Sequence, residues 1–255
     1  MTGTAGIVLA GGRSSRMGTA KAALEWHGST LLRRVAGIVG RAAGPVVVVR
    51  APGQALPPLP GDVRVVEDAR EGRGPLQGLL AGLEALDPAV EVAYVSAVDV
   101  PLLHPSFVRR ALAAVGPGDD AAVPRSGGRS HPLAAAYRTA LRPEVARLLE
   151  RDRRRMDDLV ARCRVAWLDE EAVGPGSLSN LNDPADYAAA RALPPPEVRV
   201  QRGGAVRSSR AATLGEALGA GAGLAVTVNG EPVAWDPEHP LVAGDLVTVG
   251  SVSPG

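Results

Sequence analysis

Short apolar runs that alternate with amphipathic stretches constrain the fold of this chain more than any other feature. Over residues 1–193, runs rich in valine and isoleucine are separated by segments whose apolar side chains recur every three to four positions. Such runs are typical of strands buried on both faces, and the segments between them are typical of helices that cover a sheet. This order predicts an α/β fold built on a mostly parallel sheet.

The individual elements follow from the same pattern. The expected strands are Ala5–Ala10, Val46–Arg50, Val63–Glu67 and Val92–Val98, with weaker candidates at 121–124, 131–138 and 164–168. The expected helices are Leu31–Val39, one that begins near Pro75, and segments at 105–115, 142–151 and 184–192. Helices between successive parallel strands cover both faces of the sheet. The sequence therefore predicts a Rossmann-like, doubly wound sheet.

A run of three prolines, residues 194–196, interrupts this pattern. Proline cannot continue a helix and favours an extended connector, so we expect a domain of residues 1–193 and a second of residues 197–255. The second domain is expected to contain strands at 197–202 and 205–209, a helix at 213–219, a hairpin around Asn229-Gly230 and a strand at 246–250. That order predicts a small β-grasp (ubiquitin-like) domain.

Composition limits the possible partners and location. The formal net charge of +1 gives no reason to expect the broad basic surface that nucleic-acid binding needs. The sequence has neither an apolar run long enough to cross a membrane nor an N-terminal export signal, so we expect no membrane partner and a cytoplasmic location. The single cysteine, Cys163, has no partner for a disulfide and is interpreted as a packed thiol.

The stretch "LAGGRSSRMGTAKAAL", residues 9–24, follows the first expected strand. Its glycine spacing fits neither the P-loop nor the dinucleotide-binding fingerprint. Glycines nevertheless allow main-chain N–H groups to approach an anion, and Arg13, Arg16 and Lys21 add cationic donors. The loop is therefore either a polyphosphate site or a solvated basic turn. Its position at the carboxyl end of a strand favours the first interpretation.

A second candidate site lies in "VSAVDVPLL", where Asp99 follows an apolar strand. A carboxylate at the carboxyl end of a strand can hold Mg²⁺ together with nucleotide phosphates. The alternative is a turn or helix-capping aspartate. Because the basic loop is expected at the same edge of the sheet, metal binding is the favoured interpretation.

The two stretches resemble motifs of the molybdenum cofactor guanylyltransferases. The resemblance continues in the same order through "VVEDAREGRGPLQGLLAGL", "GGRSHPLAAAYR" and "SNLNDPADY", and it spans about residues 4–192. It implies a Mg²⁺-dependent enzyme that transfers GMP from GTP to the molybdopterin of the molybdenum cofactor and releases pyrophosphate. The alternatives are transfer of CMP or of another nucleotide in cofactor synthesis, and a nucleotide-binding adaptor fused to a sulfur carrier.

The resemblance also assigns site residues. It implies main-chain contacts to the nucleotide at Leu9, Ala10, Gly11 and Gly12, a phosphate contact at Lys21, a nucleotide contact at Asp68, and a base pocket shaped by Gly74, Pro75 and Leu76. From the charge of the loop, Arg13 and Arg16 are expected to bind the nucleotide as well. Lys21 and Arg16 are expected to meet the phosphate charge, and Asp99 is the implied magnesium ligand. Asn180 and Asn182 match a segment associated with the pterin substrate, although Asn182 or Asp183 could instead cap the helix that opens at Pro184.

Some positions depart from the family pattern. Arg50 stands where asparagine is common, which removes a hydrogen-bond acceptor. "SAVD" replaces the more usual Cys-Asp pairing. Gly11 stands where cytidylyltransferase relatives carry alanine, and we expect the missing Cβ to favour GTP over CTP.

The C-terminal stretch resembles the sulfur-carrier proteins of thiamine and molybdopterin synthesis. Those carriers end in Gly-Gly, whereas this sequence has Pro254-Gly255, and proline both fixes φ and removes an N–H. We therefore expect a docking or degenerate carrier module. Its partners would be other proteins of molybdenum cofactor synthesis or client molybdoenzymes.

Overall fold

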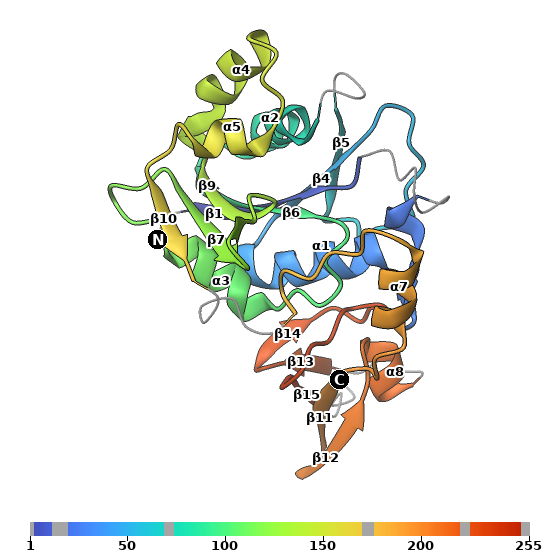
Figure 1. Ribbon diagram of the computed structural model, residues 1–255. Coiled ribbons are helices and arrows are strands. Elements are labelled where there is room, and N and C mark those ends of the chain that lie inside the picture. The colour runs from blue at the N-terminus through green and yellow to red at the C-terminus, as the bar shows by residue number, and fades with distance from the viewer. Residues whose placement is uncertain (1–2, 12–19, 69–73, 170–175, 220–224, 251–255) are drawn as a thin grey trace. The chain divides into compact units, whose positions relative to one another are not determined.

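The computed structural model describes residues 3–11, 20–68, 74–169, 176–219 and 225–250 (Figure 1). The chain forms two compact units. Unit 1 comprises residues 1–24 and 31–182, and unit 2 comprises residues 25–30 and 183–255. No helix among the described residues is both long enough and apolar enough to cross a membrane.

Unit 1 is built on an eight-stranded sheet with the order β10-β7-β9-β6-β1-β4-β5, in which β8 pairs with β7. The strands are β1 (Gly3–Leu9), β4 (Val46–Arg50), β5 (Arg64–Glu67), β6 (Val90–Ala97), β7 (Ala121–Ser126), β8 (Arg129–Ser130), β9 (Ala134–Arg138) and β10 (Val165–Leu168). In this sheet β1 runs parallel to β4 and β6, β4 runs parallel to β5, and β7 runs parallel to β10. Only β9, among the strands of the main path, pairs antiparallel with its described neighbours. The expectation of an α/β fold with a mainly parallel sheet is confirmed.

Helices cover both faces of this sheet, with α1 and α3 on one face and α2, α4 and α5 on the other (Figure 1). The helices of unit 1 are α1 (Leu31–Ala43), α2 (Pro75–Ala85), α3 (Pro105–Ala113), α4 (Arg142–Glu150) and α5 (Met156–Val160), with short 3₁₀ turns η1 (Lys21–Ala23) and η2 (Thr139–Leu141). Buried side chains of α2, α4 and α5 form one apolar core with the sheet. A Cβ added at Gly82 of α2 would lie 2.6 Å from Cγ2 of Ile7, so this glycine allows α2 to approach β1 closely.

Helix α1 extends beyond the predicted end at Val39. It continues through Gly40 to Ala43, and the next residue, Gly44, has φ 89°. A glycine in this left-handed conformation commonly terminates a helix. Helix α1 therefore accommodates Gly40, and Gly44 marks the end of the helix.

Unit 2 contains a five-stranded sheet with the order β12-β11-β15-β13-β14. Its elements are β2 (Glu25–Trp26), β3 (Ser29–Thr30), α7 (Pro184–Arg191), β11 (Glu197–Arg202), β12 (Ala205–Arg210), α8 (Leu214–Leu218), β13 (Ala225–Val228), β14 (Glu231–Val233) and β15 (Leu246–Gly250). Strands β11 and β15 are parallel, and the other pairs of this sheet are antiparallel. The predicted hairpin turn is present, with φ 55° at Asn229 and φ 86° at Gly230.

The hairpin Glu25–Thr30, which belongs to unit 2, was not predicted. His27 and Gly28 form its turn with φ 40° and 79°. Arg191 Nε donates to Glu25 Oε2 at 2.6 Å, and a ring nitrogen of His27 lies 3.0 Å from the Arg191 guanidinium. Burial alone would raise the pKa of Glu25, but the hydrogen bonds from Arg191 and from the Gly28 N–H, with the positive charges nearby, lower it overall. The carboxylate of Glu25 therefore stabilises this hairpin against α7.

A second carboxylate, that of Asp120, joins the edge strand β10 of the unit 1 sheet to its neighbour β7. Asp120 lies just before β7, and Arg164 lies just before β10. The Arg164 main-chain N–H donates to Asp120 Oδ2 at 2.8 Å, and its guanidinium contacts both carboxylate oxygens at 3.2 Å. The side-chain hydrogen bonds from Arg164, followed by its main-chain hydrogen bond, hold the pKa of Asp120 below the usual value of 3.8.

The pairing of Asp120 with Arg164 predicts a pH-dependent stability. A carboxylate whose pKa is lower in the folded than in the unfolded state adds stability above the unfolded value, and this contribution disappears as the pH falls through the folded value. We expect Asp120→Asn to lower the free energy of unfolding by more at about pH 6 than at about pH 3. Urea denaturation at both pH values measures this, with Asp62→Asn, an exposed aspartate, as the control. An equal loss at both pH values would contradict the charge-based account.

Candidate functional site

The carboxyl ends of β1, β4, β5 and β6 meet at one edge of the unit 1 sheet. These strands are parallel neighbours, so the segments that leave them share that edge. The segments carry Ala10 and Gly11 after β1, Asp68 after β5 and Asp99 after β6. In open α/β sheets, ligands bind outside the carboxyl ends of the strands.

Lys21 and Asp99 form an ion pair at this edge. Lys21 Nζ lies 2.7 Å from Asp99 Oδ2, and the two side chains are only 18% and 16% exposed. Lys21 opens the 3₁₀ turn η1, and Asp99 lies two residues beyond the end of β6. The fold thus brings together the two charged groups that the sequence analysis assigned to phosphate and metal.

The main chain of Leu181 completes this cluster. Its carbonyl accepts a second hydrogen bond from Lys21 Nζ, and its N–H donates to the Asp99 carbonyl at 2.9 Å. Leu181 itself is buried. Its neighbours Asn180 and Asn182 are exposed, and the Asn182 amide donates to the Asn180 carbonyl at 3.4 Å. The three-residue cluster therefore fixes the asparagine segment beside the lysine–aspartate pair.

The helix that follows this segment has its own cap. The Asp183 side chain accepts a hydrogen bond from the Asp186 N–H at 2.9 Å and occupies the N-cap position of α7. Of the two candidates for this role, the capping residue is Asp183. Asn182 is not needed as the cap.

Asp99 also has the chemistry of a single-carboxylate metal ligand. Its Oδ1 is buried and has no hydrogen-bond partner among the described residues. Within the same residues, no group of three or more histidine, cysteine, aspartate or glutamate side chains is placed to hold a metal ion. A cation at Asp99 would therefore need further oxygen ligands from a bound anion or water, as Mg²⁺ does in nucleotide sites. The orphaned oxygen and the donor type fit Mg²⁺.

The exit from β1 is held close to the exit from β4. The N–H groups of Ala10 and Gly11 both donate to the Val49 carbonyl, at 2.8 and 3.2 Å. The Gln54 amide donates to the Ala10 carbonyl at 3.1 Å. A Cβ added at Gly11 would lie 3.0 Å from the Ala51 nitrogen, so any larger residue would press on this neighbour. The close approach of the two main chains explains why glycine suits this position.

Gly74 and Pro75 begin helix α2 in a conformation that only glycine adopts readily. Gly74 has φ 76° and ψ 176° at the N-cap, and Pro75 occupies the first helical position. A Cβ added at Gly74 would lie 2.8 Å from the Arg154 carbonyl oxygen, which also accepts a hydrogen bond from the Leu76 N–H at 3.4 Å. The main-chain conformation of this turn, which the family resemblance assigns to the base pocket, is therefore fixed by the glycine and its close contact with Arg154.

A pocket of about 380 Å³ lies beside these segments. Its lining includes Pro75, Ala97, His131, Met156, Asp157 and Asn180. The Nε2 atom of His131 is buried and lacks a hydrogen-bond partner within the described part of the chain. The pocket has room for a small organic ligand, and it offers imidazole, carboxylate and amide groups on a largely apolar wall.

The structure places most, but not all, of the expected site residues. Gly12, Arg13 and Arg16 lie outside the described residues. The contact of Gln54 with the first loop and the place of His131 in the pocket wall were not predicted from the sequence. Neither residue lies in a spacing pattern that signals its role, because both act through contacts between segments distant in the sequence.

The fold defines the class of this protein as an α/β protein whose mainly parallel sheet carries a lysine–aspartate pair at the carboxyl ends of its strands, the edge at which such sheets bind ligands. The sequence also matches the MobA-like NTP transferase domain over residues 6–169, which is more than half of the chain. The chain belongs to this family.

Individual relatives support the same assignment. A probable molybdenum cofactor guanylyltransferase of Mycobacterium bovis is 43% identical over 159 residues, which cover 61% of this chain and 78% of the relative. A second, from Mycobacterium avium, is 38% identical over 190 residues, which cover 72% of this chain and 93% of the relative. The crystal structure of molybdopterin-guanine dinucleotide biosynthesis protein A from Archaeoglobus fulgidus has the same fold, with a TM-score of 0.57, 22% identity and coverage of 73% and 96% of the two chains.

The conformation of Gly74 predicts a loss of stability on substitution. Because its φ and ψ are strained for any residue with a Cβ, we expect Gly74→Ala to lower the free energy of unfolding by about 1–3 kcal/mol. Urea denaturation measures the change. Gly61→Ala is the control, since a Cβ at Gly61 meets nothing within 4 Å. Equal midpoints for Gly74→Ala and the parent would contradict the account.

Proposed function

We propose that this protein is a molybdenum cofactor guanylyltransferase, which transfers GMP from GTP to molybdopterin carrying molybdenum and releases pyrophosphate. Membership of the MobA-like family and the names of its relatives support the reaction. The observation that carries the proposal is the contact of Lys21 with Asp99 at the carboxyl edge, where Asp99 keeps one buried oxygen unpaired. That pair supplies the cation for phosphate and the ligand for a metal that nucleotidyl transfer requires.

The chemistry that we infer is a direct displacement at phosphorus. A phosphate oxygen of the acceptor forms a bond to the α-phosphorus of GTP, the bond from that phosphorus to the bridging oxygen breaks, and pyrophosphate leaves with the bond electrons. No covalent intermediate with the protein is needed. The contribution of the protein is alignment and neutralisation of charge.

Each part of the site has a proposed role in this displacement. The Lys21 ammonium group donates to phosphate oxygens, together with Arg13 and Arg16, and the main chain of residues 9–12 contacts the nucleotide. Asp68 contacts the nucleotide, and Gly74 and Pro75 shape the base pocket. Asp99 would hold Mg²⁺ through its unpaired Oδ1, and bound Mg²⁺ would supply neutralisation of the phosphate charge.

We propose that the pterin acceptor occupies the pocket of about 380 Å³. Asn180 lines this pocket, and Leu181 joins the same segment to Lys21 and Asp99. Acceptor and nucleotide would therefore meet at the lysine–aspartate pair. Asn182, adjacent to this segment, is a further proposed contact to the pterin.

For the C-terminal region we propose a β-grasp domain within residues 197–255, separate from a nucleotidyltransferase domain of residues 1–193. Two antiparallel strands, a short helix and three further strands follow one another, and the first and last strands are parallel neighbours at the centre of the sheet. Helix α8 buries Leu214 and Leu218 in the core of this sheet. That strand order supports the β-grasp assignment, and we propose that the domain docks proteins of molybdenum cofactor synthesis or client molybdoenzymes.

Release of pyrophosphate tests the proposed reaction. The purified protein is incubated with Mg²⁺, molybdenum cofactor and either GTP or CTP. We expect pyrophosphate only when the acceptor is present, with a preference for GTP of at least about tenfold. Transfer of CMP at an equal rate would indicate another nucleotidyltransferase of cofactor synthesis, and nucleotide binding without any release would indicate an adaptor.

The Lys21–Asp99 pair predicts the effect of single substitutions on turnover. Loss of one preorganised charge typically lowers the rate by about 10²–10³, so we expect this loss for Lys21→Ala and for Asp99→Asn. Lys21→Arg should restore little activity, because a planar guanidinium cannot replace a compact ammonium group between Asp99 and the Leu181 carbonyl. Pyrophosphate release measures the effect, and Arg147→Ala, on the exposed side of α4, is the control. Turnover near that of the parent in Lys21→Ala would contradict the assignment.

A further inference from the structure

The hairpin Glu25–Thr30 belongs to unit 2, although the chain on either side of it belongs to unit 1. The chain enters the hairpin from Leu24, directly after the turn η1 that Lys21 opens, and leaves it at Leu31, where α1 begins. The Leu31 N–H donates to the Leu24 carbonyl at 2.9 Å, and the Leu24 N–H donates to the Lys21 carbonyl at 3.1 Å. The base of the hairpin and the turn that carries Lys21 are therefore one hydrogen-bonded piece of main chain.

Side chains of unit 2 hold both strands of this hairpin. In the first strand, Tyr187 Oη donates to the Glu25 carbonyl at 2.7 Å, and Arg191 Nε donates to the Glu25 carboxylate at 2.6 Å. In the second strand, Ser29 Oγ donates to Glu238 Oε2 at 2.9 Å. The hairpin is thus bonded to α7 and to the segment that precedes β15.

The hairpin is packed and is not a free surface loop. The side chains of Trp26 and Ser29 lie in residues that are only 2% and 7% exposed. At the tip, a Cβ added at Gly28 would lie 3.5 Å from Glu216 Oε1 and 3.7 Å from Thr213 Oγ1, which places the turn against the start of α8. The position of the hairpin therefore follows that of unit 2.

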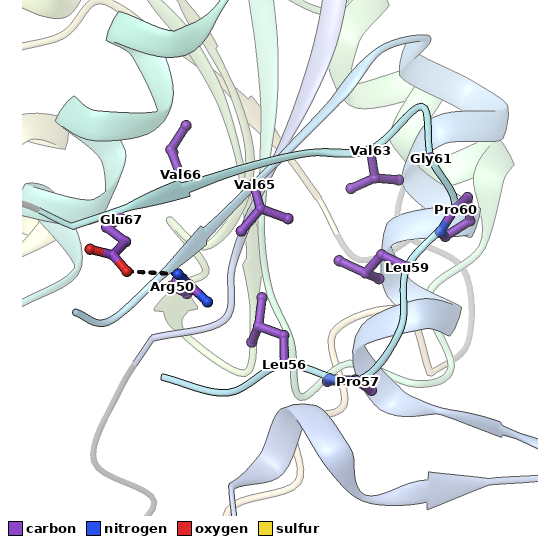
Figure 2. A pocket seen from close by; sticks show the side chains of 10 residues that line it. All are labelled: Arg50, Leu56, Pro57, Leu59, Pro60, Gly61, Val63, Val65, Val66 and Glu67. Atoms are coloured by element: carbon purple, nitrogen blue, oxygen red, sulfur yellow. Dashed lines mark hydrogen bonds and ion pairs between the residues drawn. The ribbon is translucent and has the colours of Figure 1, made fainter. Parts of the chain in front are cut away.

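Unit 1 alone holds the other end of the basic loop. The Gln54 amide donates to the Ala10 carbonyl at 3.1 Å, and Arg50 Nη1 donates to the Gln54 carbonyl at 3.0 Å. Figure 2 shows the same Arg50 paired with Glu67, at the ends of the neighbouring strands β4 and β5. The loop that starts at Ala10 is therefore held by unit 1 at its start, and the hairpin that follows Lys21 is held by unit 2.

We propose that unit 2 positions Lys21 for nucleotidyl transfer, with Ser29 and Tyr187 as positioning residues, an inference that rests on the proposed function. The contacts form a closed path. Lys21 leads through η1 to the hairpin, the hairpin is bonded to α7, and the chain before α7 returns through Leu181, whose carbonyl accepts from Lys21 Nζ.

This path gives contacts outside the site an effect on the reaction. If the hairpin is released from α7, the main chain of Lys21 loses its support, whereas Asp99 stays fixed at the end of β6. A misplacement of about 1 Å caused far from the reacting atoms can lower a rate by about 100-fold. The hydroxyl groups of Ser29 and Tyr187 therefore contribute to turnover through the placement of Lys21.

A kinetic double-mutant cycle on the full chain tests the inference. Ser29→Ala and Tyr187→Phe each remove one hydroxyl group and one hydrogen bond of the hairpin. With saturating GTP, Mg²⁺ and molybdenum cofactor, we expect roughly threefold slower release of pyrophosphate for each single variant and roughly tenfold slower release for the two together. In the Lys21→Ala background, the same substitutions should change the rate by less than about twofold, because the side chain that they position is absent.

The control is Ser208→Ala, which removes the hydroxyl group of an exposed serine of β12 in the same unit and should keep the parent rate. A parent rate in the single and combined variants would overturn the inference while leaving the proposed transfer reaction intact. A loss of the same size with and without Lys21 would also overturn it, because a general loss of folded protein lowers the rate in both backgrounds. Failure of the parent to release pyrophosphate would instead overturn the proposed function, and the inference with it.

Discussion

The ion pair between Lys21 and Asp99 is the contact on which the rest of the site depends. Both side chains are largely withdrawn from water, and removing charged groups from water is costly unless their partners are well placed. The geometry meets this condition because Leu181 accepts from the same ammonium group and donates to the main chain of Asp99. The segment after β1, the exit from β6 and the asparagine segment are thereby held at one edge of the sheet.

Lys21 is the only lysine in a sequence that contains 28 lysine and arginine residues together. Arginine serves at every other basic position, so the exception needs a physical reason. A lysine ammonium is a compact charge with three rotatable donors, whereas a guanidinium is a planar fork. Contact with one carboxylate oxygen and one main-chain carbonyl suits the ammonium group.

The sequence was most informative where one residue type determines local geometry. The β4 strand, the proline that opens α2 and the Asn229-Gly230 hairpin were predicted because apolar runs and turn residues act locally. The His27-Gly28 turn was missed, since its first residue is not typical of such turns. Helix α5 was also missed, because five residues are too few to show a helical period. The contact of Gln54 with Ala10 depends on the tertiary fold, so no local pattern could indicate it.

Binding of the nucleotide at Lys21 can be tested directly, because the sequence contains no other lysine. Expression with ¹³C-labelled lysine labels this one side chain for NMR and leaves its charge and its three donors intact. We expect this signal to shift on titration with GTP and Mg²⁺ and to reach a plateau when the protein is saturated. We expect Asp99→Asn to alter that shift. A Lys21 signal that stays unchanged when the protein is saturated with GTP would contradict the account.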